Sequence, residues 1–176
     1  MGKLVLTPIQ RKVVLKWALF SLSFLFLQVL QDVVFSRIRI LGGCPDIVPA
    51  WLLLVCLTQN PDAGALYVLG CCTFRCLCGA ALGPVSLAVL VFAGVLLNAM
   101  RRSNLWGEVR SVLVCCWAAL LAHQLLLFGL GLFLGHTVWD RLLATLGGCL
   151  GAWVAVPILY PVARALGKIG GQGWNE

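Results

Sequence analysis

Long apolar runs separated by short polar breaks are the main pattern along this chain of 176 residues. A helix crosses a bilayer with about 20 predominantly apolar residues, and proline, glycine and charged residues mark the breaks, as in GGCPD, NPDAG and RRSNLWGEVR. We therefore predict six transmembrane helices. They cover approximately residues 13–31, 46–59, 64–82, 84–100, 111–135 and 140–165.

The second run, 46–59, is short, and Pro49 interrupts its first turn, so a re-entrant segment is the alternative. The distribution of charge favours a full crossing, because Lys and Arg gather on the cytoplasmic side of membrane proteins. With six spans and a cytoplasmic N-terminus, only Arg37, Arg39 and Arg141 lie outside. Both termini are then cytoplasmic. The basic residues on that side are Lys3, Arg11, Lys12, Lys16, Arg101, Arg102, Arg110, Arg164 and Lys168.

Composition supports a membrane protein, since 61% of the residues are hydrophobic, 11% are charged and the mean hydropathy is +1.00. A soluble globular domain of this size could not bury so much apolar surface. We predict an all-α integral membrane protein with one transmembrane domain over 1–166 and a flexible cytoplasmic tail over 167–176. The formal charge of +7 is spread over loops, which fits topology and contact with membrane lipid and not nucleic-acid binding.

Nine cysteines raise the question of a metal site, above all in GCCTFRCLCG at residues 70–79. At about 100° per residue, Cys71 and Cys78 share one side of a helix, while Cys72 and Cys76 lie about a quarter-turn or more away. One helix cannot close a tetrahedral set of four thiolates from these positions. We interpret the cysteines as small apolar packing residues and expect no metal and no cofactor.

Arg75, in the same stretch, lies on a helix face of small residues that includes Cys71 and Gly79. Small residues let membrane helices approach closely, and an arginine at this depth normally faces a partner or a wet cavity. The candidate partners are Asp32, at the end of the first span, and Asp46, at the start of the second. We predict a buried ion pair; the alternatives are an ion or substrate site, or snorkelling to lipid headgroups.

Catalytic arrangements are not apparent. Ser86 and Ser111 lack the setting of an intramembrane serine nucleophile, and there is no phosphate-binding loop or paired-carboxylate site. We therefore predict that the protein is not an enzyme. The lone His123 is interpreted as a hydrogen-bonded helix contact, with a proton relay as the alternative. Glycines four apart in GLGLFLG (129–135) and GGCLG (147–151) predict close helix crossings.

Two stretches, CPDIVPAWLLLVCL (44–57) and GALYVLGCCTFRCLCGAALGPVSLAVLVFAGVL (64–96), resemble the MreD family of bacterial rod-shape-determining membrane proteins. In that family a Pro-Asp pair opens the second helix, as Pro45 and Asp46 do here. The third helix has the form Gly-Leu-x-x-Asp-Leu and ends in a Leu-Gly turn, which Gly79, Leu82 and Gly83 match. The motifs cover about the middle third of the chain.

The chain departs from the family pattern at two positions. Counting back from Gly83, the usual glycine falls on Cys71 and the usual aspartate on Arg75. The first replacement keeps a small residue, but the second reverses a charge. Any role that the family gives to this acid is therefore not carried over.

The resemblance implies a non-enzymatic scaffold of the cell-elongation complex in the bacterial inner membrane. Such a subunit would bind a single-pass MreC-like protein and link the MreB filament to peptidoglycan synthases, and its cytoplasmic loop with Arg101, Arg102 and Arg110 would meet the cytoplasm or anionic lipid. The implied fold is similar to the six-helix substrate-binding subunits of energy-coupling-factor transporters. That similarity gives the alternative function, a small-molecule-binding subunit of an uptake transporter.

Overall fold

The computed structural model of the chain describes residues 7–78, 88, 90–94 and 109–169, and in this part of the chain every regular element is a helix. Most of the predicted fourth span (84–100), the positions Gly79, Gly83, Arg101 and Arg102, and the end of the predicted tail lie outside the described residues. The elements are α1 (Pro8–Val33), η1 (Phe35–Arg37), α2 (Val48–Thr58), α3 (Pro61–Leu77), α5 (Val109–Phe133), η2 (Trp139–Arg141) and α6 (Leu142–Gly167).

Three helical stretches in the described ranges are long and apolar enough to cross a membrane. They are Pro8–Arg37 with 30 residues, Val109–Phe133 with 25 and Trp139–Gly167 with 29. Each exceeds the length of about 20 residues that a bilayer requires. The protein is therefore all-helical in its described part and has the character of a membrane protein.

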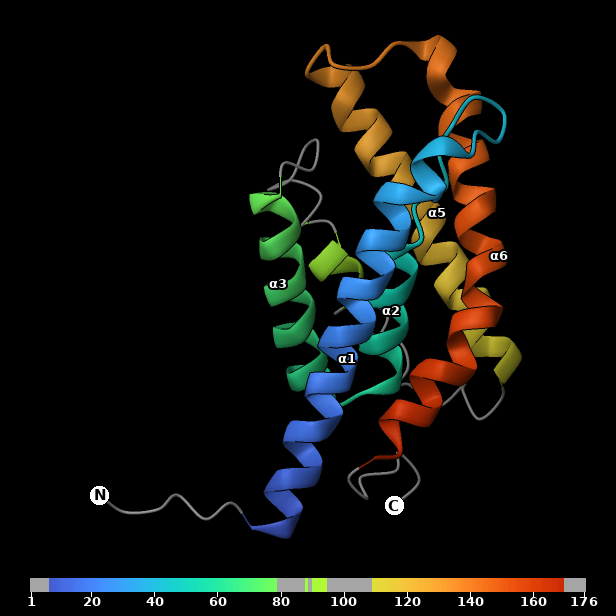
Figure 1. Ribbon diagram of the computed structural model, residues 1–176. Helices are drawn as coiled ribbons and strands as arrows, with labels where there is room; N and C mark the ends of the chain where they lie inside the picture. The colour runs from blue at the N-terminus through green and yellow to red at the C-terminus, as the bar shows by residue number, and fades with distance from the viewer. Residues whose placement is uncertain (1–6, 79–87, 89, 95–108, 170–176) are drawn as a thin grey trace.

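Each described helix runs up or down the long axis of the molecule (Figure 1). Helix α1 rises, α2 descends, α3 and α5 rise, and α6 descends again. The first turn of α1 and the last turn of α6 thus lie at the same end, which we call the lower end; the turn between α5 and α6 lies at the upper end.

Helix α2 lies within the predicted second span, 46–59, and is shorter by two residues at its start and one at its end. Its 11 residues have a length of roughly 17 Å, against about 30 Å of hydrocarbon. The helix begins at Val48 because Pro49, which has no N–H, fits only the first turn. It ends at Thr58 because Gln59 is extended. The extended chain before Val48 covers the remaining distance from the upper end (Figure 1).

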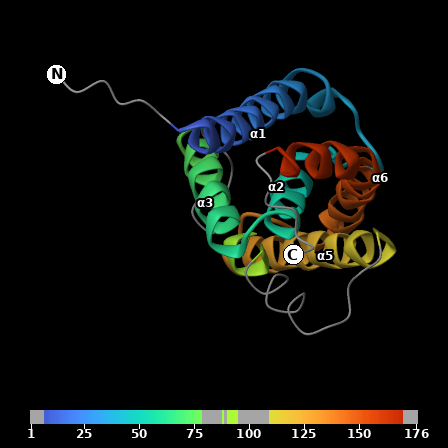
Figure 2. The ribbon, with the colours of Figure 1, turned by 90° about the horizontal axis from the view of Figure 1, so that it is seen from below.

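The position of α2 explains its composition. Seen from below, α1, α3, α5 and α6 surround it (Figure 2), and every residue from Val48 to Leu57 is buried. A helix that is apolar on all sides belongs inside a protein, so the sequence of α2 suits the centre of the bundle.

Two other boundaries shift for local reasons. Helix α3 begins at Pro61 and not at 64, because proline suits the first helical position and Asp62 complements the positive end of the helix dipole. Helix α5 ends at Phe133 and not at 135, because Gly135 has a φ of +71° and turns the chain, so that the His136 N–H donates to the Gly131 carbonyl oxygen at 2.8 Å. The predicted sixth span, 140–165, corresponds to η2 and α6.

Aromatic side chains join α1, α2 and α3 in the lower half of the core. Phe20 lies 5.9 Å from Trp51 and 6.0 Å from Tyr67 between ring centroids. The Tyr67 hydroxyl also donates to the Phe20 carbonyl oxygen at 2.7 Å. Trp17 stacks beside the same group, 5.5 Å from Tyr67. Aromatic burial and one shared hydrogen bond therefore hold α3 against α1.

Candidate functional site at the start of helix α2

A polar cluster surrounds the extended residues that lead into α2. The amide of Gln31, on α1, donates from Nε2 to the Pro45 carbonyl oxygen at 2.7 Å and accepts at Oε1 from the Ile47 N–H at 3.0 Å. Gln31 is 8% exposed. Extended backbone inside a membrane protein needs partners for its N–H and C=O groups, and one glutamine side chain provides both here.

Asp46 uses both carboxylate oxygens. Its Oδ1 accepts from the Val48 N–H at 3.3 Å, and its Oδ2 accepts from Arg75 Nη2 at 2.6 Å. The Arg75 and Asp46 side chains are 20% and 27% exposed. This is the only ion pair between side chains of the described residues. Of the two carboxylates expected as partners of Arg75, the structure therefore pairs it with Asp46.

Asp32, the other candidate partner, lies apart from this cluster. Its carboxylate accepts two hydrogen bonds from Gln28 Nε2, at 3.1 and 3.3 Å, on the exposed side of α1. Because the two residues are four apart on one helix, this contact is local. Within the described residues Asp32 makes no hydrogen bond or ion pair with the start of α2 and belongs to the upper surface of α1.

The dipoles of α2 and α3 favour the sign of each charge in the pair. Asp46 lies just before the N-terminus of α2, and Arg75 lies in the last turn of α3. Negative charge is stabilised near a helix N-terminus and positive charge near a C-terminus. The antiparallel arrangement brings these two ends together, so an arginine at position 75 suits both its own helix and its neighbour.

The four cysteines of the stretch around Arg75 differ in environment. Cys71 and Cys72 are buried at 8% and 5% exposure, Cys76 is half-buried and Cys78 is exposed. Cys71 thus contributes to the core, whereas the helix turns Cys78 outward. Among the described residues no three His, Cys, Asp or Glu side chains gather in a way that could hold a metal ion.

The segment from Ile40 to Pro45, which we call the strap, lies along the glycine face of α6. The strap turns at Leu41 and Gly42, both with positive φ, between backbone hydrogen bonds that join Ile40 and Gly43. A Cβ at Gly147 would overlap the Ile40 carbonyl oxygen, and one at Gly151 would overlap the Pro45 ring. The absence of side chains at these glycines therefore lets the extended backbone of the strap pack directly against α6.

The prediction that both glycine pairs mark helix crossings is thus wrong for the described contacts. In GGCLG the close neighbour is the strap. In GLGLFLG, a Cβ at Gly131 would meet the Thr137 side chain, and Gly135 ends α5. Sequence spacing alone cannot separate a helix neighbour from a loop neighbour, because both need a surface without side chains.

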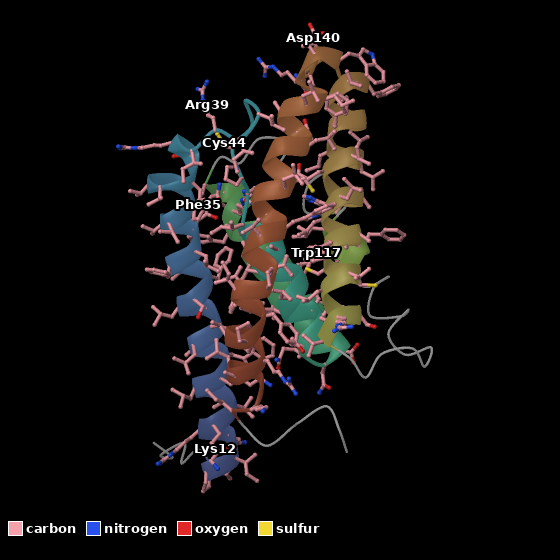
Figure 3. All side chains as sticks on the ribbon, turned by 90° about the vertical axis from the view of Figure 1, so that its right-hand side faces the viewer. Lys12, Phe35, Arg39, Cys44, Trp117 and Asp140 are labelled. Atoms are coloured by element: carbon pink, nitrogen blue, oxygen red, sulfur yellow. The ribbon has the colours of Figure 1, made fainter. Side chains whose placement is uncertain are left out.

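Basic residues occupy the lower end of the described structure, and mixed charges occupy the upper end. Lys12 lies at the lower end in Figure 3, whereas Arg39 and Asp140 lie at the upper end. Arg110, at the start of α5, is exposed on the lower side. Its predicted companions Arg101 and Arg102 are outside the described ranges. The other basic residues toward the lower end are Arg11, Lys16, Arg164 and Lys168, with Asp62 as an acidic neighbour.

Sequence reasoning missed Gln31 as a member of the site. Its signal was a polar amide in the apolar run FLQVLQD, close to the end of α1. Amides in membrane helices commonly hydrogen-bond across a helix interface. The complete cluster connects α1, the strap, α2 and α3 through satisfied polar contacts, an arrangement that fixes positions and presents no activated nucleophile.

Comparisons of the chain with protein-family models, with curated proteins and with solved structures found no match.

Proposed function

We propose that the chain is a non-enzymatic scaffold subunit of a bacterial cell-elongation complex, with six membrane spans and both termini in the cytoplasm. The observation that supports this most is the state of Pro45 and Asp46, the pair on which the resemblance to the MreD family rests. Gln31 holds the backbone on either side of Asp46, and Arg75 neutralises its carboxylate. A residue held in this way positions helices, as a scaffold requires.

The orientation follows from the charge of the two ends. Arg11, Lys12, Arg110, Arg164 and Lys168 belong to the lower end. At the upper end, Arg37, Arg39 and Arg141 are accompanied by Asp32 and Asp140. Because excess Lys and Arg mark the cytoplasmic side, the lower end is assigned to the cytoplasm. The partners are then an MreC-like single-pass protein directly, and the MreB filament and peptidoglycan synthases indirectly.

Depletion in the source bacterium tests the function. We expect rod-shaped cells to widen and round as the protein is lost, and wild-type protein supplied in trans to restore the rod. Affinity purification in mild detergent should recover a single-pass MreC-like protein. Unchanged cell width together with normal insertion of new wall material would exclude the scaffold.

The alternative is a small-molecule-binding subunit of an uptake transporter, which the partial exposure of the Arg75–Asp46 pair favours. An anionic ligand would have to compete with Asp46 for the guanidinium. In that case Asp46→Asn should strengthen ligand binding, and thermal stabilisation of the purified protein by a panel of small anions would reveal it. If the protein is a scaffold, small anions should not stabilise it, and Asp46→Asn should instead reduce the amount of partner protein recovered by affinity purification.

A further inference from the structure

Pro157 deprives one carbonyl of α6 of its usual donor. In an α-helix the N–H of each residue donates to the carbonyl oxygen four positions earlier, but proline has no N–H. Pro157 lies inside α6, so the carbonyl oxygen of Trp153 has no intrahelical partner. Away from water such a group must find another donor.

The donor comes from α5. The indole Nε1–H of Trp117 donates to the Trp153 carbonyl oxygen at 3.0 Å. The contact is reciprocal, because the indole of Trp153 donates to the Trp117 carbonyl oxygen at 3.1 Å. The two rings lie 6.1 Å apart between centroids at an angle of 31°. Two tryptophans thus join α5 and α6 at mid-height, where Figure 3 shows Trp117.

The two hydrogen bonds are not equivalent, although they look symmetrical. Helix α5 is continuous past Leu121, so the Trp117 carbonyl oxygen also accepts the N–H of Leu121 and the Trp153 indole is its second donor. The Trp153 carbonyl oxygen depends on the Trp117 indole alone. Loss of the Trp117 indole therefore leaves a backbone group bare, whereas loss of the Trp153 indole does not.

Helix α6 changes direction near this point. The last turns, drawn in red, leave the line of the upper part of the helix (Figures 1 and 2), as expected where Pro157 and Pro161 lie inside it. The glycines in the upper part of α6 pack against the strap. The last turn of α6 lies near the end of α2, where a Cβ at Gly167 would meet the Gln59 amide. The bend therefore divides α6 between two neighbours.

We propose that Pro157 is a hinge in α6 and that the indole of Trp117 is the latch that holds it closed. When the latch is engaged, the unpaired carbonyl is covered and the upper part of α6 is fixed to α5. When it is released, the segment 157–167 is free to move against α2, at the cost of exposing that carbonyl to lipid. The side chain of Pro157 is exposed, so its ring contributes little packing.

A cycle of substitutions in the full chain tests this. Trp117→Phe should lower the midpoint of thermal unfolding in detergent by about 5 °C, the shift expected for one bare backbone group. Trp153→Phe, the matched control, should lower it clearly less. Pro157→Ala restores the missing N–H, so in that background Trp117→Phe should cost no more than Trp153→Phe.

Hydrogen exchange separates a hinge from static packing. Amides over residues 158–167 should exchange several-fold faster in Trp117→Phe than in wild type, and the added Pro157→Ala should remove the difference. Equal effects of the two tryptophan variants in both backgrounds, or unchanged exchange in this segment, would overturn the proposal. If Trp117→Phe fails to accumulate, accumulation of its Pro157→Ala double variant supports the latch, and failure of both contradicts it.

Discussion

At the scale of single residues, the sign of the charge at position 75 follows from the helix ends that meet there. Asp46 precedes the N-terminus of α2, and Arg75 lies in the last turn of α3, so each charge faces the partial charge that stabilises it. An aspartate at position 75 would meet both the negative end of α3 and the carboxylate of Asp46. The arginine therefore belongs to a self-consistent local arrangement in this chain.

Removal of the guanidinium should destabilise the protein. We expect Arg75→Ala to lower the free energy of unfolding by about 1–3 kcal/mol, because Asp46 keeps its charge in a half-buried site without its partner. Arg75→Asp should be worse. The exchange of both residues (Asp46→Arg with Arg75→Asp) should restore only part of the loss, since each charge then lies at the wrong helix end. Thermal unfolding in detergent measures all three, with Asp32→Asn as the control.

Gln31 should matter more than its neighbour Gln28. Gln31→Leu removes the partners of the Pro45 carbonyl oxygen and the Ile47 N–H, at a cost of about 1–3 kcal/mol for each group left bare. Gln28 donates its side-chain hydrogen bonds to the exposed carboxylate of Asp32 and to no backbone group of the site, so Gln28→Leu should cost clearly less. Equal unfolding midpoints for the two variants would contradict the role given to Gln31.

The site was predictable from the sequence only where its chemistry left few choices. For Arg75 in an apolar helix the sequence predicted an ion pair, with Asp32 and Asp46 as its candidate partners. The choice between them depended on the strap, which places Asp46 toward α3, and hydropathy does not encode that path. Gln31 was missed because a lone amide has many acceptable partners, whereas a lone charge has few.

At the scale of elements, the apolar runs predicted where helices form but not how far each one extends. The predicted span 46–59 exceeds α2 by two residues at its start and one at its end, because hydropathy alone does not show where a helix begins or ends within an apolar run. Pro49 placed the helix start at Val48, and the backbone before it found partners in Gln31 and along α6. Similarly, the bond between the Trp117 indole and the Trp153 carbonyl has no sequence signal beyond a proline four residues after one tryptophan.

The glycines of α6 provide a test of the strap. Gly147→Ala places a methyl group against the Ile40 carbonyl oxygen, so the strap must move and we expect a loss of about 1–3 kcal/mol. Gly70 and Gly129 lie in helices with no atom within 4 Å of an added Cβ. Alanine there should be neutral or stabilise by about 0.5–1 kcal/mol through helix propensity. Unfolding midpoints that fall equally at all three positions would show that the strap does not press on α6.

At the scale of the whole molecule, the short α2 serves as the centre around which the longer helices are arranged (Figure 2). The strap and α2 together carry the chain from the upper toward the lower end (Figure 1). The extended strap is possible because α6 offers glycines and α1 offers Gln31 beside it. Only 11 residues of this part of the chain are helical.

Reporter fusions test the orientation of this arrangement. A reporter active only in the cytoplasm should work after Lys168 and fail when inserted at His136, in the turn between α5 and α6. A periplasmic reporter should give the reverse pattern. The physical reason is the excess of Lys and Arg at the lower end, whereas Asp32 and Asp140 offset basic residues at the upper end. Cytoplasmic activity at both sites would show that α6 does not cross the membrane, and with it the proposed six-span topology would be wrong.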